Sequence, residues 1–171
     1  MTSGPAVPSV SDSAGARWRL RPMRASDLDR ALQLEVELFG PAAWSYAMLA
    51  EELGASGRWY VVATERDEAS IGPEPVVGYA GLWFDGDVTQ VMTIGVARDR
   101  QHLGVGSLLL TALLDRSREL GAEAVLLEVA VNNPSAIAMY EKFGFQRLGL
   151  RKRYYQPEDV DAYTMRLPLQ A

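Results

Sequence analysis

The strongest constraint on the fold is a strand, a glycine-containing loop, a helix and a second buried strand that follow one another in the middle of the chain. Residues 88–96 are rich in β-branched residues, and the loop at 101–106 reads QHLGVG. Apolar residues then recur at helical spacing up to Gly121, a residue typical of a helix end, and residues 124–131 form an apolar strand. A strand–helix–strand unit requires a right-handed crossover, so these two strands are predicted to be parallel neighbours.

The sequence on either side of this unit predicts further strands and shorter helices. Gly40-Pro41 ends one helical segment, the Asp85-Gly86-Asp87 turn is typical of a hairpin, and Asn133-Pro134 is typical of a helix start. The predicted strands are 17–23, 59–64, 76–84, 88–96, 124–131, 145–155 and 161–169. The predicted helices begin at Ser26-Asp27, after Trp44-Ser45, after the glycine loop and at Ser135. The fold class is therefore expected to be α+β, with a mixed, mostly antiparallel sheet of about seven strands and helices on both faces.

The composition is typical of one globular domain. Of 171 residues, 48% are hydrophobic and 23% are charged. Residues 1–16 are mostly Ser, Gly, Pro and Ala and are predicted to form a flexible tail, which leaves residues 17–171 as a single domain. With no Cys and one His, a Cys/His zinc site and a cysteine nucleophile are excluded, and no metal is expected.

The net charge and the hydropathy limit the expected partners. A net charge of −5 disfavours direct nucleic-acid binding through phosphates and suits a basic peptide or an amine. The chain has no apolar run long enough for a membrane span and no cationic, apolar start typical of a secretory signal. We therefore expect a cytoplasmic protein without membrane contact.

The glycine loop at 101–106 has three interpretations from the residues alone. Glycines let the backbone approach a ligand closely, and the N–H groups at the start of the following helix suit a pyrophosphate. A dinucleotide fingerprint requires glycine where the chain has Leu109, although Glu123 and Glu128 lie at roughly the distance of a ribose-binding acid. A Walker loop requires a Gly-Lys-Ser/Thr ending, which is absent. A plain tight turn into a helix remains open.

Several spaced elements together give the chain a resemblance to a known family. They are the glycine loop before its helix, residues 127–129 (LEV), and residues 132–145 (NNPSAIAMYEKFGF). In this order they resemble the GNAT superfamily of acetyl-CoA-dependent N-acetyltransferases, over residues 18–169. Residues 151–155 (RKRYY) and 161–165 (DAYTM) make the sequence similar to the RimI type within it, which acetylates the N-terminal alanine of ribosomal protein S-18.

The resemblance implies the GNAT fold, whose seven-stranded sheet splays between its fourth and fifth strands, and acetyl-CoA as cosubstrate. Backbone groups of the fourth strand and the glycine loop would hold the cofactor, and a strand N–H would polarise the thioester carbonyl. The implied cofactor-binding residues are Ile94, Val96, Leu103, Gly104, Val105, Gly106, Ser107 and Asn133. The position of Asn133 is also typical of a helix N-cap, so both roles stay open.

The resemblance also implies the catalytic pair, with Glu128 as general base and Tyr140 as general acid. From the residues alone, a carboxylate in a buried strand is costly unless it is partnered or useful, so a structural salt bridge to an arginine is an alternative for Glu128. The alternative for Tyr140 is core packing, with its hydroxyl bonded to a carbonyl. Because the chain has no cysteine to carry an acetyl group, we expect direct attack of the amine on the thioester.

By the same resemblance, Phe39, Trp44, Tyr154 and Tyr155 would frame the slot for the substrate peptide, while packing roles remain alternatives. His102 is expected to be an exposed loop residue. The predicted activity is acetyl transfer to the N-terminal α-amine of a protein, with S-18 alanine as the favoured substrate.

Three other functions stay open at this stage. They are a broader acetyltransferase for peptides, lysines or small amines, a non-catalytic acetyl-CoA-binding module, and a dinucleotide-binding module. The RimI resemblance also raises an association with tRNA-modification enzymes, for which the sequence indicates no interface.

Overall fold

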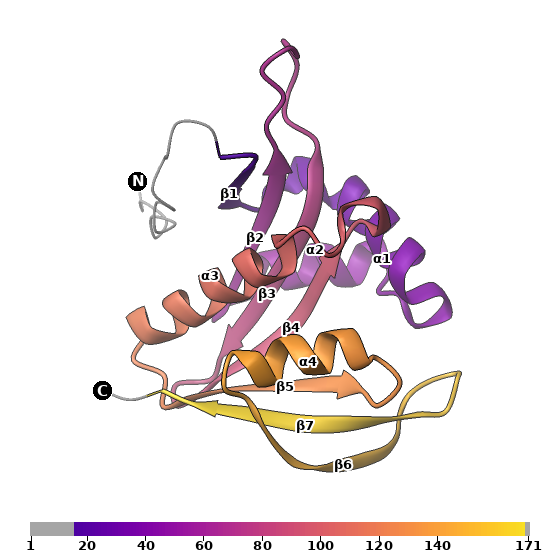
Figure 1. Cartoon of the computed structure of the whole chain (residues 1–171), viewed down its shortest axis with the longest axis vertical. Coiled ribbons are helices and arrows are strands. Elements are labelled where there is room, and N and C mark those ends of the chain that lie inside the picture. Colours follow the sequence, from indigo (N-terminus) through magenta and orange to yellow (C-terminus); the bar gives the residue numbers. More distant parts are fainter. Residues whose placement is uncertain (1–15, 170–171) are drawn as a thin grey trace.

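The computed structural model describes residues 16–169, so the predicted tail at 1–16 lies outside it except for its last residue. Within this part, one sheet has the order β1-β2-β3-β4-β5-β7-β6 (Figure 1). The strands are β1 (Trp18–Pro22), β2 (Arg58–Glu65), β3 (Val76–Phe84), β4 (Thr89–Val96), β5 (Ala124–Ala130), β6 (Gln146–Tyr155) and β7 (Val160–Pro168). The helices are α1 (Leu28–Phe39), α2 (Tyr46–Gly54), α3 (Val105–Glu119) and α4 (Pro134–Lys142), with short 3-10 turns η1 (Ala25–Asp27), η2 (Gly40–Ala42) and η3 (Arg98–Arg100).

The predicted mixed sheet is confirmed. β4 and β5 are parallel, and the other neighbouring strands are antiparallel. The last hairpin is placed so that β7 lies between β5 and β6, which leaves β6 as an exposed edge strand. None of the helices in residues 16–169 combines the length and the apolar character needed to cross a membrane.

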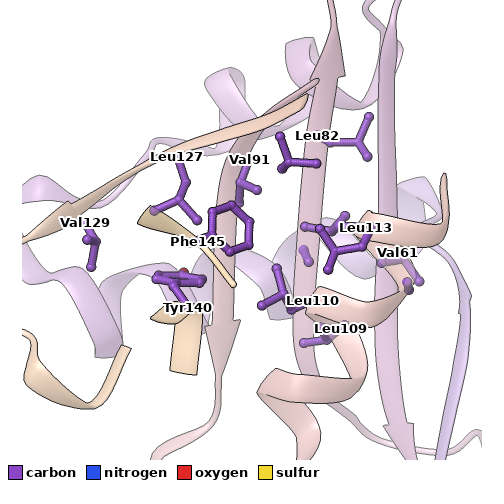
Figure 2. Packing of buried hydrophobic residues seen from close by; sticks show 14 of the residues in the cluster. Val61, Leu82, Val91, Leu109, Leu110, Leu113, Leu127, Val129, Tyr140 and Phe145 are labelled. Atoms are coloured by element: carbon purple, nitrogen blue, oxygen red, sulfur yellow. The ribbon is translucent and has the colours of Figure 1, made fainter. Parts of the chain in front are cut away.

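Helices cover both faces of the sheet, as predicted. α1 and α2 pack on one face, and α3 and α4 pack on the other (Figure 1). The side chains of Leu109, Leu113 and Tyr140 belong to the core under α3 and α4 (Figure 2). Leu34 and Tyr79 belong to a second core under α1 and α2. The sheet is thus a rigid support with a separate hydrophobic layer on each side.

Local signals define the helix ends. The Ser45 hydroxyl accepts a hydrogen bond from the Met48 N–H at 3.2 Å, and the Asn133 side chain accepts one from the Ala136 N–H at 3.2 Å. Gly121 and Gly144 take positive φ angles of 76° and 101° directly after α3 and α4, a conformation that glycine adopts without strain. The N-cap expected at Asn133 is therefore confirmed.

The predicted splay between β4 and β5 is also confirmed. The two strands pair only through Thr89 with Val125 and Gln90 with Leu126, whereas β5 pairs along its whole length with β7. Among the described strands, the carboxyl half of β4 therefore has no neighbour on its β5 side. A space opens there between two strands of one sheet.

Two tyrosines lie over glycines of neighbouring strands. Tyr60 on β2 is opposite Gly81 on β3, and Tyr79 on β3 is opposite Gly95 on β4. A Cβ added at Gly81 would lie 2.2 Å from the Tyr60 ring, and one at Gly95 would lie 2.7 Å from the Tyr79 ring. Glycine is therefore required at both positions by close packing and not by a turn.

We expect Gly81→Ala to destabilise the protein by about 1–3 kcal/mol, the usual cost of overpacking a core. The Tyr60 ring would have to move, and its hydroxyl would lose the 2.8 Å hydrogen bond to Glu52. Gly149→Ala in β6 is the control, because an added Cβ there meets nothing within 4 Å. Urea denaturation measures both variants, and equal unfolding midpoints would contradict the packing argument.

Candidate active site

A cleft of about 820 Å³ lies where β4 and β5 diverge. Its lining comes from β4, α1 and the segment before α2, the glycine loop, β5, α4 and the turn between β6 and β7. Most of the residues predicted for the site line it, namely Phe39, Trp44, Ile94, Val96, Gly104, Gly106, Ser107, Glu128, Asn133, Tyr140 and Tyr155. Residues from five separate stretches of sequence therefore meet in one cleft.

Three predicted site residues are absent from the lining. Leu103 is 46% exposed in the glycine loop, and Val105 is buried in the core beneath α3. Tyr154 is 41% exposed and packs edge-on against Tyr155, with 4.9 Å between the ring centroids.

The glycine loop brings the start of α3 to the cleft. Gly104 is the N-cap of α3 and has a φ angle of +92°. The first N–H groups of a helix have no acceptor within the helix, and they carry the positive end of its dipole. Gly106 and Ser107, in the first turn, line the cleft, which makes this end of it suitable for an anion such as a pyrophosphate. His102, also on the lining, is an exposed loop residue as expected and has a φ angle of +62°.

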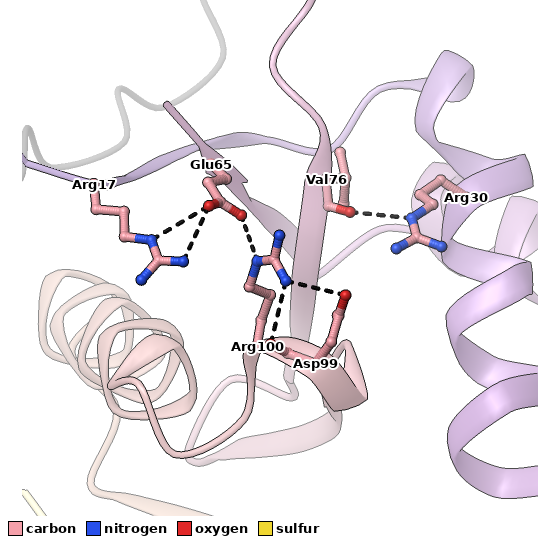
Figure 3. A network of polar contacts seen from close by, with 6 residues as sticks. All are labelled: Arg17, Arg30, Glu65, Val76, Asp99 and Arg100. Atoms are coloured by element: carbon pink, nitrogen blue, oxygen red, sulfur yellow. Dashed lines mark hydrogen bonds and ion pairs between the residues drawn. The ribbon is translucent and has the colours of Figure 1, made fainter. Parts of the chain in front are cut away.

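Ion pairs anchor the chain just before this loop. The Arg100 guanidinium lies 2.5 Å from Glu65 at the end of β2 and 3.0 Å from Asp99, and Glu65 also contacts Arg17 at 3.1 Å (Figure 3). Close by, the Arg30 guanidinium donates to the Val76 carbonyl at 3.1 Å, joining α1 to β3 (Figure 3). These ion pairs thus fix the segment just before the glycine loop to the end of β2.

Glu128 lies on β5 and lines the cleft, and 11% of its side chain is exposed. One carboxylate oxygen accepts a 2.7 Å hydrogen bond from the Thr164 hydroxyl on β7. The other lies 3.4 Å from the Arg151 guanidinium, which is 56% exposed. The ion pair considered as an alternative from the sequence is therefore present, and the same carboxylate lines the cleft.

Tyr140 lies on α4, which packs on the same face of the sheet as α3. Its side chain is buried and packs edge-on against Phe145, with ring centroids 5.7 Å apart (Figure 2). Burial raises the pKa of the Tyr140 hydroxyl to about 12. The ring thus belongs to the core, as the alternative interpretation held, while the residue also lines the cleft as a phenol that keeps its proton at neutral pH.

The turn between β6 and β7 closes the cleft beside Glu128. The Tyr155 hydroxyl donates to the Glu128 carbonyl at 3.2 Å, and burial raises the pKa of this hydroxyl. Glu158 from the same turn also lines the cleft, and no pattern in the sequence indicated it. In residues 16–169, His, Asp and Glu side chains form no cluster of three suited to a metal ion.

Sequence reasoning also missed Glu35, a buried carboxylate on α1 that lines the cleft. The sequence nevertheless contains a signal that marks Glu35 as unusual. Glu35 lies four residues after Ala31 and three before Leu38, which places a charged residue on the apolar face of a helix. A charge at a core position has a structural or functional partner far more often than it is accidental.

Comparison with known proteins decides the family. The family described as "Acetyltransferase (GNAT) family" matches residues 24–145. The chain belongs to the GNAT acetyltransferase family. The RimI N-alpha-acetyltransferase of Mycobacterium tuberculosis is 40% identical over 146 residues, which cover 82% of this chain and 86% of that protein. An uncharacterised Mycobacterium leprae protein is also 40% identical over 146 residues, but these cover only 38% of its length.

Solved structures agree with this assignment. The crystal structure of the Escherichia coli ribosomal-protein S-18 alanine N-acetyltransferase has a TM-score of 0.77 at 26% identity, covering 90% of this chain and 95% of that one. Arabidopsis thaliana NAA60 in complex with acetyl-CoA has a TM-score of 0.80 at 18% identity, covering 90% and 99%, and shows the shared fold. This GNAT chain is therefore an acetyl-CoA-dependent N-acetyltransferase similar to RimI, and the resemblance drawn from the sequence is confirmed.

For this GNAT enzyme we expect Glu65→Gln to raise the KM for acetyl-CoA by about twofold to fivefold, the range of a partly exposed ion pair, with little change in kcat. The reason is that Arg100, just before the glycine loop, loses its charged partner on β2 and keeps only the neighbouring Asp99. Glu68→Gln is the matched control, because Glu68 pairs with Arg66 and is 77% exposed. An acetyl-CoA KM that stays at the wild-type value in Glu65→Gln would contradict this anchoring role.

The same ion pairs make a pH prediction. The hydrogen bond from Arg100, reinforced by Arg17, holds the pKa of the Glu65 carboxyl below its usual value. A carboxyl with a lowered folded pKa contributes stability above its unfolded pKa, about 4.3, and loses that contribution as the pH falls through the folded value. Wild-type stability should therefore fall more steeply with acid below about pH 4.5 than that of Glu65→Gln, measured by thermal denaturation at a series of pH values.

Proposed function

We propose that this enzyme transfers the acetyl group of acetyl-CoA to the N-terminal α-amine of a protein, with the N-terminal alanine of ribosomal protein S-18 as the favoured substrate. The observation that carries the proposal is the arrangement of the cleft. The cleft is lined by the start of α3, by Glu128 of β5 and Tyr140 of α4, and by Phe39 and Trp44 at and after the end of α1. The similarity to two RimI-type enzymes supports the choice of an α-amine.

The cofactor would occupy the α3 end of the cleft and the free edge of β4. The pyrophosphate would bind the N–H groups that follow Gly104, and the amide-bearing pantetheine arm would pair with backbone groups near Ile94 and Val96 as an added strand does. Because the Asn133 side-chain oxygen caps α4, its amide nitrogen remains as a donor for the cofactor. Both roles considered for Asn133 are thus compatible.

The chemistry would need one proton removed and one proton supplied. An α-ammonium has a pKa near 8, so an appreciable fraction is neutral at pH 7 and Glu128 would accept the proton from the rest. The amine nitrogen would form a bond to the thioester carbonyl carbon, and the carbon–sulfur bond would break. The Tyr140 hydroxyl would give its proton to the leaving sulfur, and the proton that the newly acylated nitrogen loses would restore that hydroxyl. A β4 N–H such as that of Val96 would stabilise the carbonyl oxygen.

The slot for the peptide would lie between the α1 side and the β6–β7 turn. Phe39 and Trp44 would form one wall, and Tyr155, against which Tyr154 packs edge-on, would form the other. The carboxylate of Glu158 on the lining, together with the net charge of −5, favours a cationic N-terminal segment. An association with tRNA-modification enzymes stays a prediction.

The test is acetylation of a peptide that copies the alanine-starting N-terminus of S-18 and contains an internal lysine. Fragment mass spectrometry locates the acetyl group, and the same peptide with a blocked N-terminus is the control. We expect acetylation of the α-amine and none of the blocked peptide. Acetylation of the lysine alone would contradict the α-amine assignment and favour a lysine acetyltransferase. Absence of transfer with acetyl-CoA bound would contradict the proposed substrate, and polyamines would then be the next amines to try.

A further inference from the structure

The buried carboxylate of Glu35 has no part in the mechanism above. Glu35 lies on α1, is 2% exposed, and is one of the residues that line the cleft. Burying a carboxylate is costly unless donors satisfy it. The contacts of this side chain therefore indicate what it does.

Three donors from three different segments converge on the Glu35 carboxylate. Oε1 accepts hydrogen bonds from the Tyr79 hydroxyl on β3 and, at 3.3 Å, from the Thr93 hydroxyl on β4. Oε2 accepts one from the backbone N–H of Trp44 at 3.1 Å. No Arg or Lys of residues 16–169 forms an ion pair with it, so these hydrogen bonds alone satisfy the group.

The Trp44 contact is the one that bears on the cleft. Trp44 lies between η2 and α2, in a segment that leaves α1 through Gly40, whose φ angle is +52°. The hydrogen bond from the Trp44 N–H attaches the backbone of this segment to the Glu35 carboxylate. Tyr79 on β3 and Thr93 on β4 hold that carboxylate in place by their own hydrogen bonds. This segment carries Trp44, which together with Phe39 at the end of α1 makes up one proposed wall of the peptide slot.

We propose that Glu35 is a positioning residue that determines the shape of the peptide slot by fixing the Trp44 segment to β3 and β4. It acts through Trp44 and makes no contact with the reacting atoms. This inference rests on the proposed function only because it takes the slot to be the place where the peptide binds. The hydrogen bond between Trp44 and Glu35 does not depend on that function.

Two substitutions separate hydrogen bonding from charge. In Glu35→Gln, the amide oxygen takes the place of Oε2 and accepts from Trp44, while the amide nitrogen donates to the Tyr79 and Thr93 hydroxyls, which both act as acceptors. In Glu35→Leu, the side-chain volume is roughly kept and all three donors lose their acceptor. Glu37→Leu is the matched control, because Glu37 is exposed on the same helix two residues away.

The measurements are steady-state kinetics with the S-18 peptide and hydrogen exchange of the backbone amides in residues 40–46. For Glu35→Leu we expect the peptide KM to rise about tenfold, the effect of losing a hydrogen bond to a charged group, while kcat and the KM for acetyl-CoA stay within about twofold. Exchange in residues 40–46 should accelerate. Glu35→Gln should restore the peptide KM to within about threefold of wild type, and Glu37→Leu should match wild type in every measurement.

Three results would overturn the inference. One is unchanged exchange in residues 40–46 of a folded Glu35→Leu variant. Another is a fall in kcat with no change in peptide KM, which would make Glu35 part of the chemistry. The third is Glu35→Gln as impaired as Glu35→Leu, which would show that the charge matters and the hydrogen bonds do not. If the wild-type enzyme does not acetylate the peptide, the proposed function fails, whereas the exchange comparison still decides the role of Glu35.

Discussion

Glu128→Gln is expected to lower kcat with the S-18 peptide by about a hundredfold at pH 7, within the range of a lost general base. Glutamine keeps the shape of the side chain, and its amide can still meet the Thr164 hydroxyl on β7. It cannot accept a proton from the incoming ammonium. The loss should shrink as the pH rises past about 8, because the α-amine then arrives neutral without help. Steady-state rates of both enzymes between pH 6 and 9.5 measure this convergence.

Glu141→Gln on α4 is the matched control for this prediction. Glu141 pairs with Arg147 at 2.9 Å, and nearly half of its side chain is exposed, so the same chemical change is made on a surface carboxylate that lies outside the cleft lining. Its kcat should equal that of wild type. A Glu128→Gln enzyme with wild-type kcat at pH 7 would leave only the structural role, the ion pair with Arg151, for this carboxylate.

Tyr140→Phe is expected to lower kcat by about tenfold to a hundredfold, with little change in the KM for acetyl-CoA, because the leaving sulfur loses its proton donor. Phenylalanine keeps the edge-on packing against Phe145, so the stability should stay near that of wild type. Since burial raises the pKa of the Tyr140 hydroxyl to about 12, the wild-type enzyme should show no alkaline loss of kcat from this group up to about pH 10. Steady-state kinetics and thermal denaturation check both expectations.

Tyr163→Phe serves as the control for Tyr140→Phe. Tyr163 lies on β7 with the Arg147 guanidinium over its ring and is absent from the cleft lining, so removal of its hydroxyl should leave kcat unchanged. Equal kcat values for wild type and Tyr140→Phe would mean that the thiolate leaves without this donor. Equal losses in the two variants would point to a general effect of removing a phenol and not to a proton donor in the cleft.

Much of the fold could be predicted because its signals are local. Gly121 and Gly144 end their helices through their own positive φ angles, and Asn133 caps α4 through an N–H only three residues away. The parallel pairing of β4 and β5 follows from the handed crossover of α3, which is a property of the strand–helix–strand unit itself. Each of these features depends on neighbours in the sequence, so a single chain is enough to indicate it.

The site could be predicted only in part. Glu128 and Tyr140 were identified by a family resemblance, and the structure places both on one cleft. Glu35 was not predicted because a helical pattern shows that a charged residue faces the core but does not show which groups form hydrogen bonds with it. Glu158 was not predicted because a turn residue lines a cleft only when the two strands that the turn connects bring it there.

Local patterns were enough to indicate the helices and strands to within about two residues, the turn residues, the parallel central pair and the family. No local pattern indicated that β7 lies between β5 and β6, which brings Thr164 to Glu128 across 36 residues of chain, or that Glu35 meets Thr93 across 58. The difference lies in the range of the interactions. Caps, turns and periodic apolar faces are satisfied within a few residues, whereas a buried carboxylate is satisfied by whichever donors the strand order brings to it.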